Sequence, residues 1–232
     1  PGEDWKWFDY YQDYCMNFLN DIGIKKDNLR LRKHKKEELV FYSKGTTDIE
    51  YKYPHGWGEL WGIADRTDYD LTVHSNHSKN ELKYLDPETN EKYTPYVIEP
   101  SVGCDRLTLA ILCDAYNEET LEDGSTREVM KLSASLSPYK VSVLPLVKKF
   151  HKEKAEEIYR MLSKHFMCSY DETGNIGKRY RRCDAIGTPY AITVDDETIN
   201  NNTVTIRDRD TMNQITLKLD DVIKYIEEKI QL

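Results

Sequence analysis

The sequence predicts an α/β (α+β) protein in two parts. Short segments that alternate apolar and polar residues predict strands, and segments with apolar residues at three- and four-residue steps predict helices. The pattern changes near residue 137, where SLSPY resembles a short linker. We therefore expect one domain over 1–136 and a second, compact mixed α/β domain over 137–232.

The composition excludes several classes of protein. The 232 residues are enough to bury a sizeable core. No apolar run approaches the roughly 20 residues that cross a bilayer, which argues against an integral membrane protein. Five Cys without a CxxC pair predict neither a disulfide framework nor a zinc ribbon, and favour a reducing cytoplasm.

Charge is distributed unevenly along the chain. The net charge of −8 argues against a protein that coats DNA by charge alone. Residues 1–136 carry 17 Lys and Arg against 26 Asp and Glu, whereas residues 137–232 carry 16 against 15. This asymmetry indicates two domains with different partners.

The first part should contain an antiparallel sheet with helices. In chain order, we expect a helix at 5–22 that stops at Gly23, a charged solvated stretch at 25–38, strands at 46–53 and 58–65, a helix start at Thr67, a hairpin or excursion at 77–94, a strand at 95–100, an apolar helix at 101–116 and an acidic loop at 117–126.

The second part alternates strands and helices. In chain order, we expect strands at 140–146 and 166–170 around a helix at 149–165, a basic turn and helix at 173–187, a strand at 189–194, a hairpin at 203–219 and a last helix at 220–231.

The segment EPSVGCDR at 99–106 is the sharpest chemical signal. A strand ends in the carboxylate of Glu99, and a Gly-containing turn then places Arg106 in the first turn of an apolar helix. An Arg there opposes the helix dipole. A bound phosphate would explain it, and so would a nearby acid such as Asp105 or Asp65. The spacing alone favours neither.

The strand at 58–65 carries charge among apolar residues. Strict alternation puts one set of side chains on one face, namely Glu59, Trp61, Ile63 and Asp65. The other face would hold Leu60, Gly62 and Ala64. Charges on a buried strand are costly unless they pair or bind a ligand, and both explanations fit here.

Two further patterns are less specific. Four of the five residues at 178–182 are basic and surround a Tyr, a composition suited either to an RNA backbone or to a solvated helix face. His74 and His77 have helical spacing, but no third ligand stands at a useful distance. The motifs therefore predict no protein metal site.

Several long motifs together resemble one family. GWGELWGIADRTDYDL (56–71), YVIEPSVGCDR (96–106), GNIGKRYRRCDAIGTPY (174–190) and TVTIRDRDTM (203–212) are similar to glycyl-tRNA synthetases of the dimeric type, which are class II ligases. The resemblance implies the antiparallel-sheet part of a class II catalytic domain, followed by a mixed-sheet α/β anticodon-binding domain. It also implies glycine–tRNA ligase activity in protein synthesis.

The same resemblance implies roles for particular residues. Arg106 and Glu99 would carry catalysis, with Arg106 on the ATP phosphates and Glu99 on the amino group of glycine. The implied ATP site comprises Glu59, Leu60, Gly103, Cys104, Asp105 and Arg106. The implied glycine site comprises Arg66, which would take the substrate carboxylate, with Glu99, Pro100, Ser101, Val102 and Gly103.

The resemblance also implies partners. These are ATP with Mg²⁺, glycine, glycine tRNA and, in the intact cytoplasmic enzyme, a second identical subunit. The implied tRNA-binding residues are Lys178, Arg179, Arg181 and Arg182, with Arg207 and Arg209 as secondary candidates.

The sequence departs from the family because motifs 1 and 2 would precede Pro1. We therefore expect the C-terminal half of a ligase, inactive as the 232-residue chain alone. The alternative is a non-catalytic, synthetase-like nucleic-acid-binding protein or polymerase accessory protein. Such a protein would lose substrate residues, whereas Glu59, Arg66, Glu99, Ser101 and Arg106 are all present.

Overall fold

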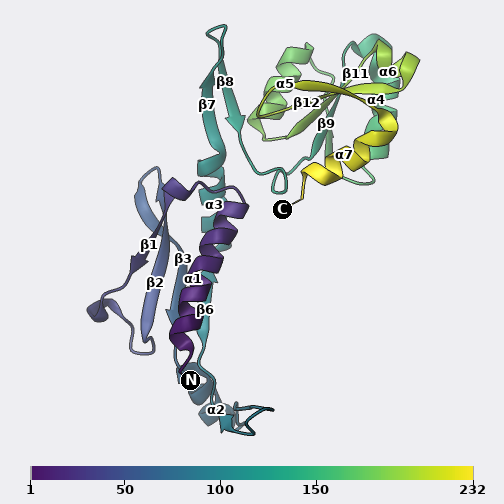
Figure 1. Ribbon diagram of the computed structural model, residues 1–232. Helices are drawn as coiled ribbons and strands as arrows, with labels where there is room; N and C mark the ends of the chain where they lie inside the picture. Colours follow the sequence, from purple (N-terminus) through teal and green to yellow (C-terminus); the bar gives the residue numbers. More distant parts are fainter. Residues whose placement is uncertain (1, 232) are drawn as a thin grey trace. The chain divides into compact units, whose positions relative to one another are not determined.

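The computed structural model describes residues 2–231 and divides by its internal contacts into two compact units, Pro1–Cys113 and Asp114–Leu232 (Figure 1). Both units combine helices with sheets, so the α/β (α+β) class is confirmed. Among the described residues, no helix is long and apolar enough to cross a membrane.

The first unit is built on a four-stranded antiparallel sheet in the order β1-β2-β3-β6. Its strands are β1 (Leu29–Lys33), β2 (Gly45–Tyr53), β3 (Gly56–Asp65) and β6 (Ile98–Val102). Helix α1 (Asp4–Asp21) packs against β2, β3 and β6 and buries Phe8, Cys15 and Leu19. Burial raises the pKa of the Cys15 thiol to about 11. Gly23 follows the helix with a φ of 105°, a conformation that favours glycine.

Short elements complete the first unit. They are the 3₁₀ turns η1 (Lys26–Asn28) and η2 (Lys36–Glu38), α2 (Tyr69–Ser78), β4 (Tyr84–Leu85), β5 (Lys92–Tyr93) and α3 (Cys104–Ala115). The hairpin within 77–94 is confirmed by the β4–β5 pair. The stretch at 25–38 is mostly exposed, as expected for a solvated face, and within it β1 forms the edge of the sheet by pairing with β2.

The second unit is a five-stranded mixed sheet in the order β10-β9-β11-β12-β13. The strands are β9 (Val141–Pro145), β10 (Cys168–Tyr170), β11 (Tyr190–Val194), β12 (Thr203–Asp208) and β13 (Gln214–Lys218). Strands β10, β9 and β11 are parallel, and β12 and β13 continue the sheet antiparallel. The helices are α4 (Lys148–Leu162), α5 (Ile176–Ala185), α6 (Asp196–Asn201) and α7 (Val222–Lys229), the last preceded by the turn η3 (Leu219–Asp221).

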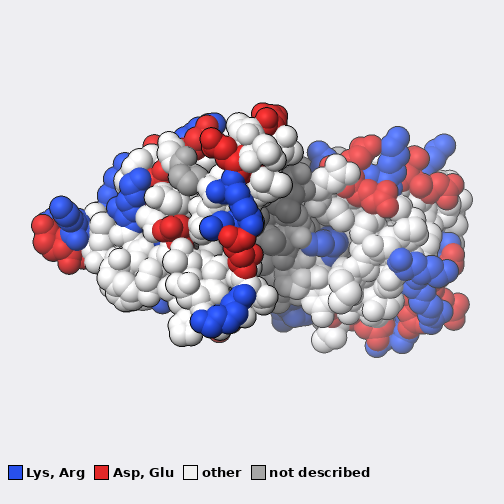
Figure 2. Space-filling view, turned by 90° about the horizontal axis from the view of Figure 1, so that it is seen from below, with Lys and Arg blue, Asp and Glu red and all other residues white. Residues whose placement is uncertain are grey.

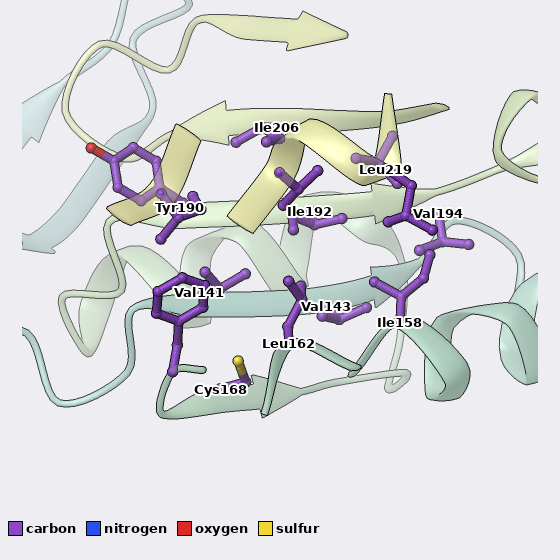
Figure 3. Close-up of a cluster of buried hydrophobic side chains, with 14 of the residues drawn as sticks. Val141, Val143, Ile158, Leu162, Cys168, Tyr190, Ile192, Val194, Ile206 and Leu219 are labelled. Atoms are coloured by element: carbon purple, nitrogen blue, oxygen red, sulfur yellow. The ribbon is translucent and has the colours of Figure 1, made fainter. Parts of the chain in front are cut away.

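A large apolar cluster forms most of the core of the second unit (Figure 3), and a smaller one joins Leu144, Cys183 and Ala191. Every residue of β9 and β11 is buried, as expected for parallel strands covered on both faces. Ile158 and Leu162 of α4 and Val222 and Ile226 of α7 meet these strands with no exposed surface. Fully burying a side chain of this type stabilises the fold by about 1.5–3 kcal/mol.

Two elements of the second unit differ from expectation. The acidic loop expected at 117–126 is a hairpin of β7 (Tyr116–Thr120) and β8 (Thr126–Met130), and the sequence analysis did not foresee α6. The hairpin packs on α5, which is why the contact-based division at residue 113 precedes the predicted domain boundary. The boundary at 136/137 itself stays a prediction.

Candidate functional site

One face of the first sheet is lined by charged side chains. A bulge in β3 creates this arrangement: Ile49 is opposite Trp61, but Glu50 is opposite Glu59, so Leu60 is an extra residue. A Cβ on Gly62 would lie 3.5 Å from Glu59 Oε1, which places Glu59 on the face of Gly62. Strict alternation was therefore wrong for Glu59, because it assumes an unbroken register.

The bulge leaves the two faces of the sheet chemically distinct. On the opposite face, Trp61 meets Phe18 of α1 with ring centroids 5.8 Å apart. The charged face gathers Asp48 and Glu50 of β2 with basic side chains of the edge strand β1. Arg30 Nε donates to Glu50 at 2.6 Å, and His34 Nε2 lies 2.7 Å from Asp48 Oδ2. These pairs satisfy carboxylates whose side chains are only 11–12% exposed.

Glu99 lies on β6 opposite Ala64, at the open edge of this face. Its Oε2 accepts a hydrogen bond from Arg66 Nη1 at 2.8 Å, and its side chain is 45% exposed. Arg66 also donates to both oxygens of Asp70, at 2.5 and 2.9 Å. The guanidinium stacks on the Tyr42 ring, 4.3 Å from its centroid. One cation therefore orients two carboxylates.

Arg66 and Asp70 shift each other's pKa. The hydrogen bonds from Arg66 hold the pKa of Asp70 below its usual range. Asp70 and then Glu99 raise the pKa of the Arg66 guanidinium, so its charge is permanent at any physiological pH. The sequence analysis missed Asp70 and Tyr42. The i,i+4 spacing of Arg66 and Asp70 was the signal that would have found the acid.

Arg106 stands at the first turn of α3 and faces Glu59. Its Nη1 donates to the Glu59 carbonyl at 2.9 Å and lies 3.6 Å from Glu59 Oε2, and both side chains are 53% exposed. The sequence left open whether Arg106 meets a phosphate or a nearby acid. An acid does lie beside it, but that acid is Glu59 and not Asp105 or Asp65. If Gly103 carried a Cβ, the one neighbour found for it within 4 Å among the described residues would be Arg106 Cβ. The space in front of Gly103 is therefore open.

The remaining predicted residues of the first unit fall into two groups. Leu60 is 1% exposed and belongs to the core, so only its backbone could face a ligand. The others lie in β6 or at the start of α3. In β6, Pro100 is half-buried and Ser101 and Val102 are exposed; Cys104 and Asp105, which begin α3, are exposed as well. The structure thus brings Glu59, Arg66, Glu99 and Arg106 to one sheet, on neighbouring strands or at their ends.

The basic cluster predicted on α5 is divided by the fold. Arg179 is 3% exposed and donates to the carbonyls of Pro145, Glu172 and Gly174, which gives it a structural role. Arg182 donates to Asp171 and to the Thr173 carbonyl. Arg181 is half-buried beside the β7–β8 hairpin. Lys178 is exposed, and no ion pair joins it to a carboxylate among the described residues.

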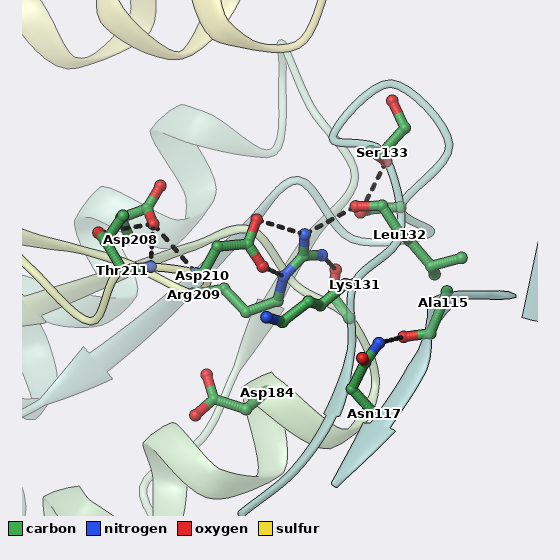
Figure 4. Close-up of polar contacts among 12 residues, drawn as sticks. Ala115, Asn117, Lys131, Leu132, Ser133, Asp184, Asp208, Arg209, Asp210 and Thr211 are labelled. Atoms are coloured by element: carbon green, nitrogen blue, oxygen red, sulfur yellow. Dashed lines mark hydrogen bonds and ion pairs between the residues drawn. The ribbon is translucent and has the colours of Figure 1, made fainter. Parts of the chain in front are cut away.

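Arg207 and Arg209, the secondary candidates, lie inside the second unit. Arg207 makes a bidentate pair with Asp184 at 2.8 and 3.0 Å. Arg209 donates to the carbonyls of Leu132 and Gly187 and to Asp210 (Figure 4). Both are less than a tenth exposed, so they are not available to RNA. On the face shown in Figure 2, positive and negative side chains are mixed over both units.

Comparisons with known proteins identify relatives of the chain. Residues 140–229 match the family model of an anticodon binding domain. The chain is 62% identical over 231 residues to a glycine–tRNA ligase of Clostridium tetani, covering 100% of this chain and 50% of that protein. It is 58% identical over 230 residues to the ligase of Geobacillus kaustophilus, covering 99% and 50%.

A solved structure supports the fold alone. The RNA binding domain of threonyl-tRNA synthetase from Cryptosporidium parvum Iowa II superposes with a TM-score of 0.72 at 19% identity, covering 99% of this chain and 61% of that one. The sequence relatives of the chain are aminoacyl-tRNA ligases. The chain is homologous to glycine–tRNA ligases, and it spans about half the length of the curated relatives that it matches.

Proposed function

We propose that this chain is part of an ATP-dependent glycine–tRNA ligase, in which the first unit holds glycine and ATP and the second unit binds glycine tRNA. The observation that carries the proposal is the carboxylate of Glu99, which is held in place by Arg66 and still 45% exposed near the start of β6. The whole-chain identity of 62% to a glycine–tRNA ligase supports it.

Glycine recognition needs a fixed carboxylate for the ammonium group and a pocket too small for a side chain. Glu99 supplies the carboxylate, and Ser101 in β6 and Gly103 directly after β6 follow along the chain. Arg66 already serves two carboxylates, so we revise its role from holding the substrate carboxylate to positioning Glu99. Excluding a larger side chain by lack of space is effective, because overlap costs more than lost contact.

ATP activation requires positive charge on the phosphates rather than a covalent nucleophile. Arg106 is exposed, adjacent to the open space at Gly103, and suited to bidentate phosphate binding. No group of three or more His, Cys, Asp or Glu suited to a metal is found among residues 2–231. Mg²⁺ would therefore be held mainly by the ATP phosphates, and Glu59 is the carboxylate best placed to share it.

The tRNA is assigned to the edge where the parallel strands of the second unit end. Strand β9 lies between β10 and β11, so the connection after β9 runs to one side of it and the next connection crosses to the other side. Ligands of open α/β sheets usually bind at such a switch point, beyond the carboxyl ends of the strands. Phe150, 63% exposed, begins α4 at this edge, and Lys178 begins α5. An aromatic ring beside lysines suits the unpaired bases of an anticodon loop.

The same proposal includes the intact assembly. We infer a homodimeric enzyme of the cytoplasm, a compartment that the five free cysteines favour. The 232-residue chain alone should not exchange pyrophosphate with ATP in the presence of glycine, because it spans half of each relative.

The test is Glu99→Gln in the full-length ligase. The amide keeps the shape but removes the charge opposite the ammonium group, and truncating a buried charge pair costs about 2–5 kcal/mol. We expect kcat/KM for glycine to fall at least about thirtyfold, while KM for ATP changes little. Glu81→Gln is the matched control, since Glu81 pairs with Lys83 and Lys92 elsewhere on this unit. An unchanged KM for glycine, with a lowered melting temperature, would reject the assignment.

A further inference from the structure

The turn after β3 joins a buried acid to the arginine of the candidate glycine site. Asp65, the last residue of β3, has no exposed surface, and Arg66 follows it directly. The side chain of Asp65 points toward α1, where its carboxyl is hydrogen-bonded to that of Asp4. Arg66 instead donates to Glu99 at 2.8 Å. Asp65 therefore lies behind the sheet, where it can affect a ligand only through its neighbours.

Thr67, the residue after Arg66, has a strained backbone. Its φ is 53°, in the left-handed region that a β-branched residue rarely adopts. The other residues with a positive φ among residues 2–231 are glycines, which adopt it freely, and Lys79, Asn90, Asn202 and Met212, which are unbranched at Cβ. Strain of this kind persists only where the surrounding structure holds it, and such positions are concentrated at functional sites.

Three hydrogen bonds hold this turn. The Thr67 backbone N–H donates to Asp65 Oδ1 at 3.0 Å. The Val97 N–H donates to the Thr67 carbonyl at 2.8 Å, and the Val97 carbonyl accepts from the Arg66 N–H at 2.9 Å. Val97 stands two residues before Glu99, so the turn fixes the backbone of Arg66 beside that of its partner. Of the three bonds, the one to Asp65 is made by a side chain.

Asp65 is itself held by residues at the starts of two elements. Its carbonyl accepts a hydrogen bond at 2.8 Å from the N–H of Lys44, just before β2, and its carboxyl meets Asp4 at the start of α1. Lys44 pairs with Asp4 and lowers the pKa of that carboxyl, whereas burial raises the pKa of Asp65. Of the two carboxyls, Asp65 is therefore the one that keeps a shared proton. An asparagine, with one acceptor and one donor, would reproduce both of its side-chain hydrogen bonds.

The same turn places the second acid of Arg66. Helix α2 begins at Tyr69, two residues after Thr67, and Asp70 in its first turn accepts two hydrogen bonds from Arg66. If Thr67 left the left-handed region, the chain would change direction between the sheet and α2. The guanidinium could then no longer meet both Asp70 and Glu99, because one acid lies on α2 and the other on the sheet.

We propose that Asp65 is a positioning residue of the glycine site, which holds the turn 65–67 in the conformation from which Arg66 meets Glu99. The inference rests on the proposed function, because its effect is exerted through the carboxylate that would bind the ammonium group of glycine. Asp65 does not touch glycine itself. A residue that only filled space behind the sheet would need neither the bond to Thr67 nor the strained φ that this bond maintains.

The experiment measures steady-state kinetics of the full-length ligase for glycine and for ATP. Asp65→Ala removes the acceptor for the Thr67 N–H, so kcat/KM for glycine should fall between about tenfold and a hundredfold, the scale of a misplaced binding group. KM for ATP should stay within about twofold, because the lost interaction serves glycine. Asp65→Asn keeps the acceptor and should stay within about threefold of wild type. Adding Thr67→Gly to Asp65→Ala should recover most of the loss, because glycine adopts the left-handed conformation without steric cost.

Two further variants control for misfolding and for indirect effects. Asp65→Leu fills the same buried space without an acceptor, so it should fold even if Asp65→Ala does not, and it should show the same loss for glycine. Asp86→Ala is the matched control. Asp86 accepts two backbone N–H groups in the turn of the β4–β5 hairpin, beside the left-handed Asn90. Its loss should leave the glycine kinetics unchanged.

The same variants distinguish this positioning role from the glycine site itself. The role of Asp65 would be overturned by wild-type glycine kinetics in Asp65→Ala and Asp65→Leu, or by a loss that Thr67→Gly does not recover. A loss in Asp65→Asn as large as that in Asp65→Ala would overturn it as well. If Glu99→Gln keeps its effect in these cases, the glycine site stands without Asp65. Unchanged glycine kinetics in Glu99→Gln would instead reject the proposed function, and with it the role of Asp65.

Discussion

The two units use the same chemical pair, an arginine with a carboxylate, in opposite ways. In the first unit, Arg66 and Glu99 meet at the open end of a strand, with side-chain exposures of 20% and 45%. In the second unit, Arg207 and Arg127 share Asp184, and all three side chains are 7% exposed or less. The contact distances in the two pairs are similar, so burial is what distinguishes a candidate binding site from an ion pair with a structural role.

Burial decides because of the cost of removing water from charges. A buried ion pair gains little net stability over an apolar replacement, but removing one partner leaves an uncompensated charge. A half-exposed pair is screened, and each partner can be hydrated when the other is lost. The buried group also ties the β7–β8 hairpin to α5, because Arg127 belongs to β8 and Asp184 to α5.

The largest effect should come from Asp184→Asn. The change removes the negative charge with almost no change of volume. It leaves Arg207 without a carboxylate partner, while Arg127 keeps only its ion pair with Glu119. We expect unfolding of the second unit to become easier by about 3–5 kcal/mol, measured as a shift of its urea midpoint.

Glu99→Gln provides the contrast within the same chain. Arg66 keeps both hydrogen bonds to Asp70, so the free energy of unfolding should change by less than about 1 kcal/mol. Equal destabilisation by the two substitutions would remove the distinction drawn between the buried and the open pair.

The sequence predicted elements well where a local pattern defines them. The helix expected at 5–22 is observed at Asp4–Asp21, and the strand expected at 189–194 is observed at Tyr190–Val194. It also located Arg106 at a helix start, because the Gly-containing turn before it is a local signal. The strand expected at 95–100 is instead observed at Ile98–Val102, so Glu99 lies near the start of the strand and not at its end. The assignment of ligands to these residues came from family resemblance.

Features that depend on distant partners were not predictable. The burial of Arg207 requires Asp184, 23 positions earlier in the chain, and the burial of Arg127 requires a partner 57 positions later. The basic pattern at 178–182 could not show that Arg179 turns inward to three carbonyls. The bulge at Leu60 was not predicted for a related reason: the register of β3 is set by its pairing with the neighbouring strand β2.

An intermediate effect should follow from Gly187→Ala, which tests how closely the turn after α5 packs on the end of β8. Gly187 has a φ of 80°, and a Cβ there would lie 2.9 Å from Leu132 Cδ1 and 3.0 Å from the Met130 carbonyl oxygen. Left-handed backbone and overlap together should cost about 2–4 kcal/mol. Thermal unfolding followed by circular dichroism measures it.

Gly124→Ala is a matched control for that substitution. Gly124, at the tip of the β7–β8 hairpin, has the same φ of 80°, and a Cβ there would meet nothing within 4 Å among the described residues. Only the backbone cost of about 1–2 kcal/mol should remain. If the two variants lose equal stability, close packing between the hairpin strand and the end of α5 contributes nothing measurable.

The smallest effect concerns Lys178, which is the counterpart in the second unit of an open, unpaired charge. Its exposed ammonium group is free of ion pairs among residues 2–231, whereas Arg179 is buried against carbonyls. Lys178→Gln should weaken binding of glycine tRNA by only about two- to fivefold, because one exposed charge is worth about 0.2–1 kcal/mol. Its signature is a fall of roughly 0.9 in the slope of log affinity against log salt, the share of one phosphate contact.

Lys164→Gln, beyond the opposite end of α4, should leave both affinity and slope unchanged. Arg179→Gln should instead lower stability and leave the slope of the folded protein intact. A reduced slope for Lys164→Gln and not for Lys178→Gln would place the RNA at the other edge of the sheet.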